Sequence, residues 1–263
     1  MPRFEANIRW MFKEFDMPER FVQAARCGFK GVEHGDPYAW PAKEVARWLK
    51  DNGLVMVQIL TPQDWAAGEL GLTTLPGREA DFREAVKRGI EYAVTVDCKM
   101  LHPAVGGTPK GEARERTWAR CVENLAFACD EGGKSGLTLP IEPVCSARFP
   151  DFFIHTLDEG IQLIKDVGRN NLKLCFDTYH VQMEEGAISY NLERAWPWIG
   201  HLQLGNPPGR HEPGVGELNL QHYFDLIDRK GWQGWVGCEY TPSTTTLDSL
   251  SWGAAYGLRK PDG

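Results

Sequence analysis

Several patterns that would assign this chain to a well-defined class are missing from its sequence. No apolar run approaches the roughly 20 residues that a membrane-spanning helix needs. The N-terminal stretch MPRFEANIRW contains no apolar core of a signal peptide. The seven cysteines are widely spaced and include no C-x-x-C pair, which is typical of a reduced chain. We therefore expect a cytoplasmic protein with no membrane partner.

An excess of positive charge is missing too. The chain has 29 lysines and arginines against 36 aspartates and glutamates, which gives a formal net charge of −7. Nucleic-acid-binding proteins usually carry a basic face, so this balance argues against a nucleic-acid partner.

What the chain does have is a regular alternation of short apolar runs with amphipathic segments. Eight apolar runs predict strands at 4–10, 31–34, 54–60, 99–105, 137–144, 172–180, 200–206 and 234–240. Helical patterns are predicted between them at 17–28, 41–53, 77–94, 111–133, 156–168 and 218–231. Strands that alternate with helices indicate a parallel sheet. Eight such units predict a (β/α)8 TIM barrel, an α/β fold, as a single domain over 1–263.

A doubly wound open sheet is the alternative fold. Such a sheet usually carries a glycine-rich phosphate loop after its first strand. The stretch NIRWMFKEF at that place has no glycine, which favours the barrel.

Polar side chains stand at the ends of the last four predicted strands, namely Glu142, Asp177, Gln203 and Glu239. The intervals between them are each about the length of one strand–helix unit. Neighbouring barrel strands place their C-terminal ends side by side, so we expect these side chains to converge at the barrel mouth. A single acidic residue there is usually solvated or ion-paired, but recurrence on four consecutive strands indicates a common ligand.

Carboxylates held this close repel one another unless a cation is present. The set offers only oxygen atoms, which suits Mg²⁺ or Mn²⁺ better than zinc. A divalent ion flanked by two glutamates is suited to enolisation, because one carboxylate can remove a proton and the other can return it. We therefore predict catalytic roles for Glu142 and Glu239, with Asp177 and Gln203 as further metal ligands.

Taken in order, several stretches resemble the hydroxypyruvate isomerase family, which belongs to the xylose isomerase-like barrels and includes 2-oxotetronate isomerases. The resemblance is carried by RFEANIRWMFKEF, GFKGVE, DWAAGELGL, LPGRE, IEP, NLKLCFDTYH, GHLQLG, GRHEPGVGELN and GWVGCEY. It implies a barrel with a divalent metal and an aldose–ketose isomerase of a small hydroxy-keto acid. The family's metal and acid–base positions fall on the same four residues that the spacing singles out.

The sequence departs from the family pattern in the predicted βα loops. The second strand is followed by EHGDPY, with His34 and Asp36, and the third by TPQDW, with Thr61 and Gln63. The loop after the fifth strand contains Arg148. Such loops line the substrate pocket of a barrel, so we expect these differences to bear on the substrate rather than on the type of reaction.

Three residues are further candidates for contact with a small-molecule sugar-acid substrate. Arg210 and His211 could bind a carboxylate, for which arginine offers bidentate geometry. The alternative for this pair is an ion pair within the loop, with Glu212 or Glu217. His180 could donate a hydrogen bond to a substrate hydroxyl or play a structural role.

Other functions fit parts of the pattern. A ketose 3-epimerase on the same scaffold would usually have His in place of Gln203 and Glu near Arg148. A DNA-repair endonuclease of this fold would need more histidines and a basic surface. A non-catalytic sugar-acid-binding protein would not need two glutamates. Barrels of this kind are often dimers or tetramers, so a homo-oligomer is possible.

Overall fold

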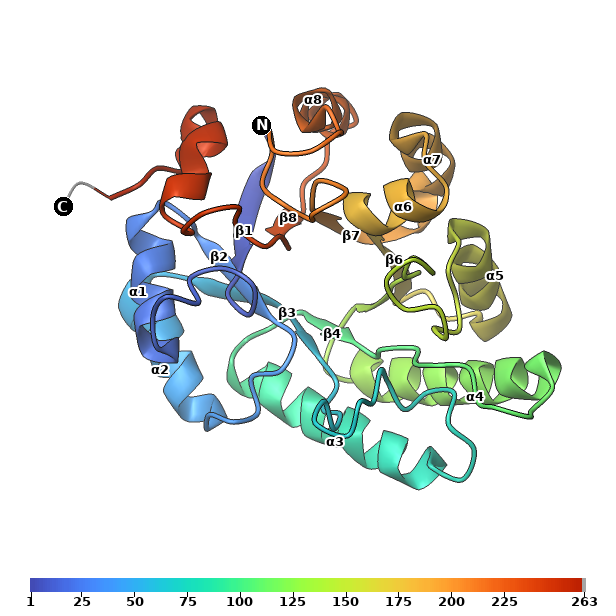
Figure 1. Ribbon diagram of the computed structural model, residues 1–263. Helices are drawn as coiled ribbons and strands as arrows, with labels where there is room; N and C mark the ends of the chain where they lie inside the picture. Colours follow the sequence, from blue (N-terminus) through green and yellow to red (C-terminus); the bar gives the residue numbers. More distant parts are fainter. Residues whose placement is uncertain (262–263) are drawn as a thin grey trace.

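Eight parallel strands form the centre of the molecule in the computed structural model, which describes residues 1–261 (Figure 1). The predicted domain of 1–263 includes two residues, 262 and 263, that lie outside this range. The strands are β1 (Arg3–Asn7), β2 (Gly31–His34), β3 (Val55–Leu60), β4 (Met100–His102), β5 (Leu139–Ile141), β6 (Leu172–Asp177), β7 (Ile199–Leu204) and β8 (Trp235–Cys238).

The strands follow the order β4-β3-β2-β1-β8-β7-β6-β5, and each pair of neighbours in this order is parallel. A parallel bridge between Met100 and Thr138 joins the two ends of this order. The amide of Leu101 donates to the carbonyl of Thr138 at 3.1 Å, and the amide of Thr138 donates to the carbonyl of Lys99 at 3.0 Å. These contacts close the sheet into a barrel. The (β/α)8 prediction is therefore confirmed, and the open-sheet alternative is wrong.

Helices surround the barrel and follow one another in chain order (Figure 1). They are α1 (Met17–Arg26), α2 (Ala42–Asn52), α3 (Glu79–Thr95), α4 (Arg114–Gly133), α5 (Leu157–Val167), α6 (Thr178–Glu184), α7 (Ile188–Ala195) and α8 (Leu220–Arg229), with 3-10 helices η1 (Trp196–Trp198) and η2 (Asp248–Tyr256). Their apolar faces pack on the strands and bury large side chains such as Phe21, Phe82 and Phe224. Across residues 1–261, the structure has no helix with the length and apolar character to cross a membrane.

The segment between β6 and β7 differs from the prediction. A strand was expected through residue 180, but β6 ends at Asp177 and α6 begins directly after it. The carboxylate of Asp177 accepts a hydrogen bond from the amide of Tyr179 at 2.9 Å, which caps the helix N-terminus and stops the strand. As a result, His180 lies on the first turn of a helix above the barrel.

Candidate active site

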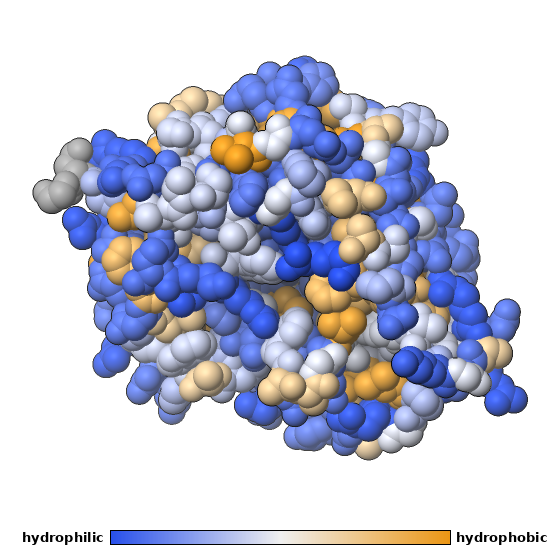
Figure 2. Space-filling view, in the orientation of Figure 1, coloured by the Kyte–Doolittle hydropathy of each residue, from blue (hydrophilic) through white to orange (hydrophobic). Residues whose placement is uncertain are grey.

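A cavity of about 180 Å³ opens where the strands end. Glu142, Gln203 and Glu239 contribute to its polar part, while Trp10 and Trp65 are among its aromatic lining residues. Figure 2 shows a hollow near the middle of the face seen in Figure 1, where strongly hydrophilic surface meets a group of hydrophobic side chains. The carboxyl ends of barrel strands are where active sites of this fold lie, so this cavity is the candidate site.

The three predicted carboxylates come together here. Glu142 follows β5, Asp177 ends β6 and Glu239 follows β8. The guanidinium group of Arg210 contacts both Asp177 Oδ2 and Glu239 Oε2, the latter at 3.0 Å. His180 Nε2 lies 3.8 Å from Glu142 Oε1 and 3.9 Å from Asp177 Oδ2. The fold therefore brings together the three acidic side chains that the sequence spacing selected.

Burial dominates the electrostatics of this group. It raises the pKa of Glu142 well above its ordinary value, and the neighbouring charges of Glu239 and Asp177 raise it further. Burial also raises the pKa of Glu239 to about 8, although Arg210 opposes the shift. The pKa of Asp177 rises for the same reason, again against the effect of Arg210. One guanidinium group is thus insufficient to keep all three carboxylates ionised at neutral pH.

The residues present fit a divalent cation. When ionised, the three carboxylates together with Arg210 leave two negative charges, which a dication would balance. Glu142 Oε1 is buried, and within residues 1–261 it has no hydrogen-bond partner. A buried carboxylate oxygen without a partner is costly, and a metal ion bound there would remove the cost.

His180 has a fixed orientation. The amide of Cys145 donates to His180 Nδ1 at 3.2 Å, so the neutral ring carries its proton on Nε2. Burial lowers the pKa of His180 well below its ordinary value, and Arg210 and Arg148 lower it further. One ligand atom each from Glu142, Asp177 and His180 lies within 4.8 Å of the others, a spacing that could hold a metal. In this tautomer, however, Nε2 carries a proton and has no lone pair for a metal, and at 3.8 and 3.9 Å it is too far from the two carboxylates for a hydrogen bond.

Gln203 reaches the same cavity but is tied to a second polar group. Its Nε2 donates to Glu33 Oε1 at 2.7 Å, and its Oε1 accepts from Cys175 Sγ at 2.9 Å. Glu33 also accepts hydrogen bonds from Asn7 Nδ2 at 2.8 Å and His201 Nε2 at 3.0 Å. Glu33 therefore fixes which end of the Gln203 amide carries the oxygen. The metal-ligand role of Gln203 stays a prediction.

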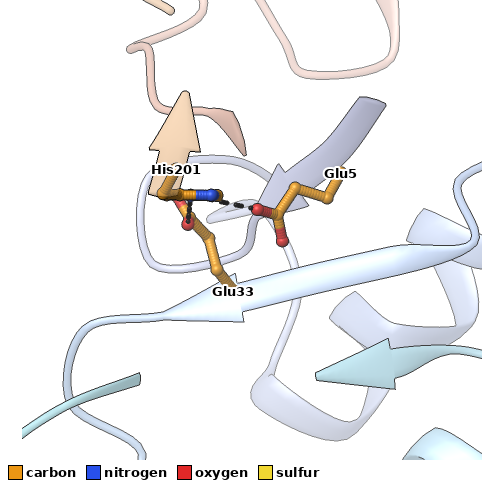
Figure 3. A group of neighbouring side chains, drawn as sticks. All are labelled: Glu5, Glu33 and His201. Carbon is orange, nitrogen blue, oxygen red and sulfur yellow. Dashed lines mark hydrogen bonds and ion pairs between the residues drawn. The ribbon is translucent and has the colours of Figure 1, made fainter. Parts of the chain in front are cut away.

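Beneath the site lies a buried group that the sequence pattern did not single out as a unit, consisting of Glu5, Glu33 and His201 (Figure 3). His201 Nε2 lies 3.3 Å from Glu5 Oε1 and 3.0 Å from Glu33 Oε2. Burial raises the pKa of Glu5 well above its ordinary value, and the charge of Glu33 raises it further. Although burial opposes the change, hydrogen bonds from His201, Gln203 and Asn7 lower the pKa of Glu33. The period-two spacing of Glu5 and Asn7 on β1 is the signal that could have revealed inward-facing polar side chains.

The two residues predicted to bind a substrate carboxylate separate in the structure. Arg210 is buried in the site, has a φ of +55°, and donates from Nε to the carbonyl of Glu239 at 2.9 Å. Arg210 forms ion pairs with Asp177 and Glu239. The alternative ion pair within the loop, with Glu212 or Glu217, is therefore not formed. His211 Nδ1 lies 2.8 Å from the carbonyl of Thr241, and His211 is not among the described residues that line the cavity.

A family model for the xylose isomerase-like TIM barrel matches residues 21–256. This chain belongs to that family. Among its curated relatives in the xylose isomerase-like family, a 2-oxo-tetronate isomerase from Cupriavidus necator is 43% identical over 253 residues, which cover 96% of this chain and 97% of the relative. A hydroxypyruvate isomerase from Escherichia coli is 41% identical over 253 residues, or 96% of this chain and 98% of the relative. The predictions of family and of an isomerase-type enzyme are confirmed.

Solved structures agree on the xylose isomerase-like fold. A structure described as an AP endonuclease, family 2, from Brucella melitensis has a TM-score of 0.95 and is 39% identical, covering 97% of this chain and 99% of that one. An L-ribulose 3-epimerase has a TM-score of 0.77 at 22% identity, covering 97% of this chain and 86% of that one. The second likeness concerns the fold alone.

Proposed function

We propose that this chain is a divalent-metal-dependent aldose–ketose isomerase of a small hydroxy-keto acid, of the hydroxypyruvate or 2-oxotetronate type. The observation that carries the proposal is the pair Glu142 and Glu239, which line one small cavity and both have raised pKa values. Groups that hold or release a proton near neutral pH are suited to general acid–base chemistry. The names of the relatives at 43% and 41% identity support the same substrate class.

The metal would be Mg²⁺ or Mn²⁺, held by Glu142, Asp177 and Glu239 with the amide oxygen of Gln203. When bound, such an ion polarises the substrate carbonyl and lowers the free energy of an enediolate. The hydrogen bond from Gln203 Nε2 to Glu33 supports this set, because it assigns the amide nitrogen to Glu33 and makes the oxygen, which here accepts from Cys175 Sγ, the end that can bind a metal.

The protein's own groups then carry the proton. In hydroxypyruvate, one of the two glutamates removes a proton from the hydroxyl-bearing carbon, and the electron pair forms the carbon–carbon double bond of an enediolate. The second glutamate returns a proton to the neighbouring carbon, and the proton of the original hydroxyl group moves to the former carbonyl oxygen, so that the product has an aldehyde next to a new hydroxyl group. Glu142 and Glu239 follow β5 and β8, so they can act from different sides of the substrate.

Arg210 and His180 would assist this transfer. Arg210 holds Asp177 and Glu239 in place through its two ion pairs. His180 presents Nε2–H toward the same space and can donate to a substrate oxygen. Trp10 and Trp65 line the cavity and would limit the access of water to the intermediate.

Two further points support this function. One solved relative carries the name of an endonuclease, but the net charge of −7 and the small cavity favour a small-molecule substrate here. The seven buried, free cysteines within residues 1–261 fit a reducing compartment, so we place the activity in the cytoplasm.

The test is deuterium exchange. The protein is incubated in D₂O with Mg²⁺ or Mn²⁺ and with hydroxypyruvate, 2-oxotetronate or a panel of neutral ketoses, and deuterium incorporation is followed by NMR. We expect exchange with at least one of the two acids, and its loss in Glu239→Gln. Exchange with ketoses alone would replace the proposal with the 3-epimerase, and exchange with none would refute both.

A further inference from the structure

Two guanidinium groups line the cavity without ion-pair partners. Arg9 comes shortly after β1, and Arg148 lies in the loop between β5 and α5. Within residues 1–261, neither side chain has a carboxylate within 4.0 Å or a hydrogen bond to a protein acceptor. Arg210, the third arginine of the described cavity lining, is already engaged by Asp177 and Glu239. Arg9 and Arg148 are therefore the cavity arginines available to an anion.

Aromatic rings hold both groups in place. The guanidinium carbon of Arg9 lies 4.1 Å from the ring centroid of Trp65. That of Arg148 lies 5.5 Å from the ring centroid of Trp10 and 5.7 Å from that of Phe149. Stacking on a ring face occupies the flat side of a guanidinium group and leaves its N–H edge free to bind oxygen atoms.

The neighbouring loop is shaped around Arg9. A Cβ atom at Gly35 would lie 3.3 Å from Arg9 Nη1 and 3.7 Å from Arg9 Cδ, so the glycine leaves room for this side chain. His34 Nδ1 accepts from the amide of Asp36 at 2.9 Å, which fixes the turn. His34 stays neutral, because burial together with the charges of Arg9 and Arg20 lowers its pKa to about 3. The stretch that begins at His34, the last residue of β2, and the loop of Arg148 are among the places where the sequence departs from the family pattern.

We propose that Arg9 and Arg148 form a carboxylate subsite that binds the acidic group of the substrate. Arg9 is half-buried, and a desolvated cation gains most from a bound anion. The carboxylates of Glu142 and Glu239 would repel an acidic group on their side, so the subsite orients the substrate with its reacting carbons toward them. The inference rests on the proposed function and deepens it, because it selects a keto acid over a neutral ketose.

The experiment compares Arg9→Gln and Arg148→Gln with the control Arg83→Gln. Arg83 also stacks on an aromatic ring, that of Phe127 at 5.1 Å, but it does not line the described cavity. The first readout is binding of propionate and of its neutral isostere propionamide to the Mn²⁺-loaded and metal-free proteins, followed by ligand-observed NMR. This readout requires no turnover.

We expect each cavity variant to weaken propionate binding about tenfold, as for loss of a charge-assisted pair, without changing propionamide binding. The KM for hydroxypyruvate should rise about ten- to a hundredfold with a smaller change in kcat, while Arg83→Gln behaves as wild type. Unchanged propionate binding in both cavity variants would overturn the subsite, even if the isomerase is active. Tighter binding of inorganic phosphate than of propionate would overturn the carboxylate assignment. Failure of the wild type to exchange either hydroxypyruvate or 2-oxotetronate, with propionate binding intact, would instead refute the proposed reaction.

Discussion

Metal binding by this protein should release protons, and the number released follows from the site. Burial raises the pKa of Glu239 to about 8 in the metal-free protein. At pH 7, roughly nine in ten molecules therefore carry a proton on this carboxyl group. A divalent cation binds the ionised form, so about one proton should leave Glu239 on binding. Glu142, whose pKa is also raised, should contribute a further fraction.

The consequence is a steep dependence of metal affinity on pH. Each proton released weakens the apparent affinity about tenfold, or about 1.4 kcal/mol, for each pH unit below the pKa. We expect the Kd for Mn²⁺ to fall at least tenfold between pH 6 and pH 7 and to level off above about pH 8. Isothermal titration in buffers of different ionisation enthalpy counts the protons directly.

Two variants make this prediction specific. In Glu239→Gln, metal binding should weaken and the proton count at pH 7 should drop by about one. In Glu193→Gln, which removes an exposed carboxylate on α7 that pairs with Lys230, both quantities should stay at the wild-type level. A Kd that is constant between pH 6 and pH 8, with the same heat in every buffer, would refute the raised pKa values and the metal site built on them.

Three more outcomes follow from the buried charges. Burial raises the pKa of Glu5 in the folded protein, so the folded protein keeps a proton that the unfolded chain loses above about pH 4.3. Between that pH and the pKa of Glu5 in the folded protein, the free energy of unfolding falls by about 1.4 kcal/mol for each pH unit. In urea unfolding, the stability of Glu5→Gln relative to wild type should therefore increase from pH 5 to pH 7. A difference that does not change with pH would contradict this. Glu33→Gln should lower Mn²⁺ affinity about tenfold, because Gln203 loses the charged acceptor of its amide, while circular dichroism should still show a folded barrel. An affinity equal to that of wild type would rule out that Glu33 positions Gln203. Arg210→Gln removes the ion-pair partner of two buried carboxylates and should cost about 3 kcal/mol at pH 8, with part of the loss restored by Mn²⁺. Absence of rescue would speak against their sharing a metal.

The sequence by itself determined the barrel and the acidic part of its site. Strand and helix periodicities are local properties, and eight alternating units leave few arrangements other than a closed parallel barrel. The same repeat placed Glu142, Asp177 and Glu239 at equivalent strand ends, so their convergence followed once the fold was known. The end of β6 was predicted wrongly, because the cap formed by the Asp177 side chain competes with an apolar pattern that continues past it.

The tertiary structure alone decided which polar groups meet. The hydrogen bonds from Gln203 and His201 to Glu33 join residues about 170 positions apart, and no periodic pattern encodes such a pairing. The same holds for the arginines, since the sequence singled out Arg210 as a carboxylate binder while the fold engages it with Asp177 and Glu239 and leaves Arg9 and Arg148 available. Whether a charged side chain is paired or free depends on distances set by packing across the barrel, and electrostatic interactions in a buried site respond strongly to those distances.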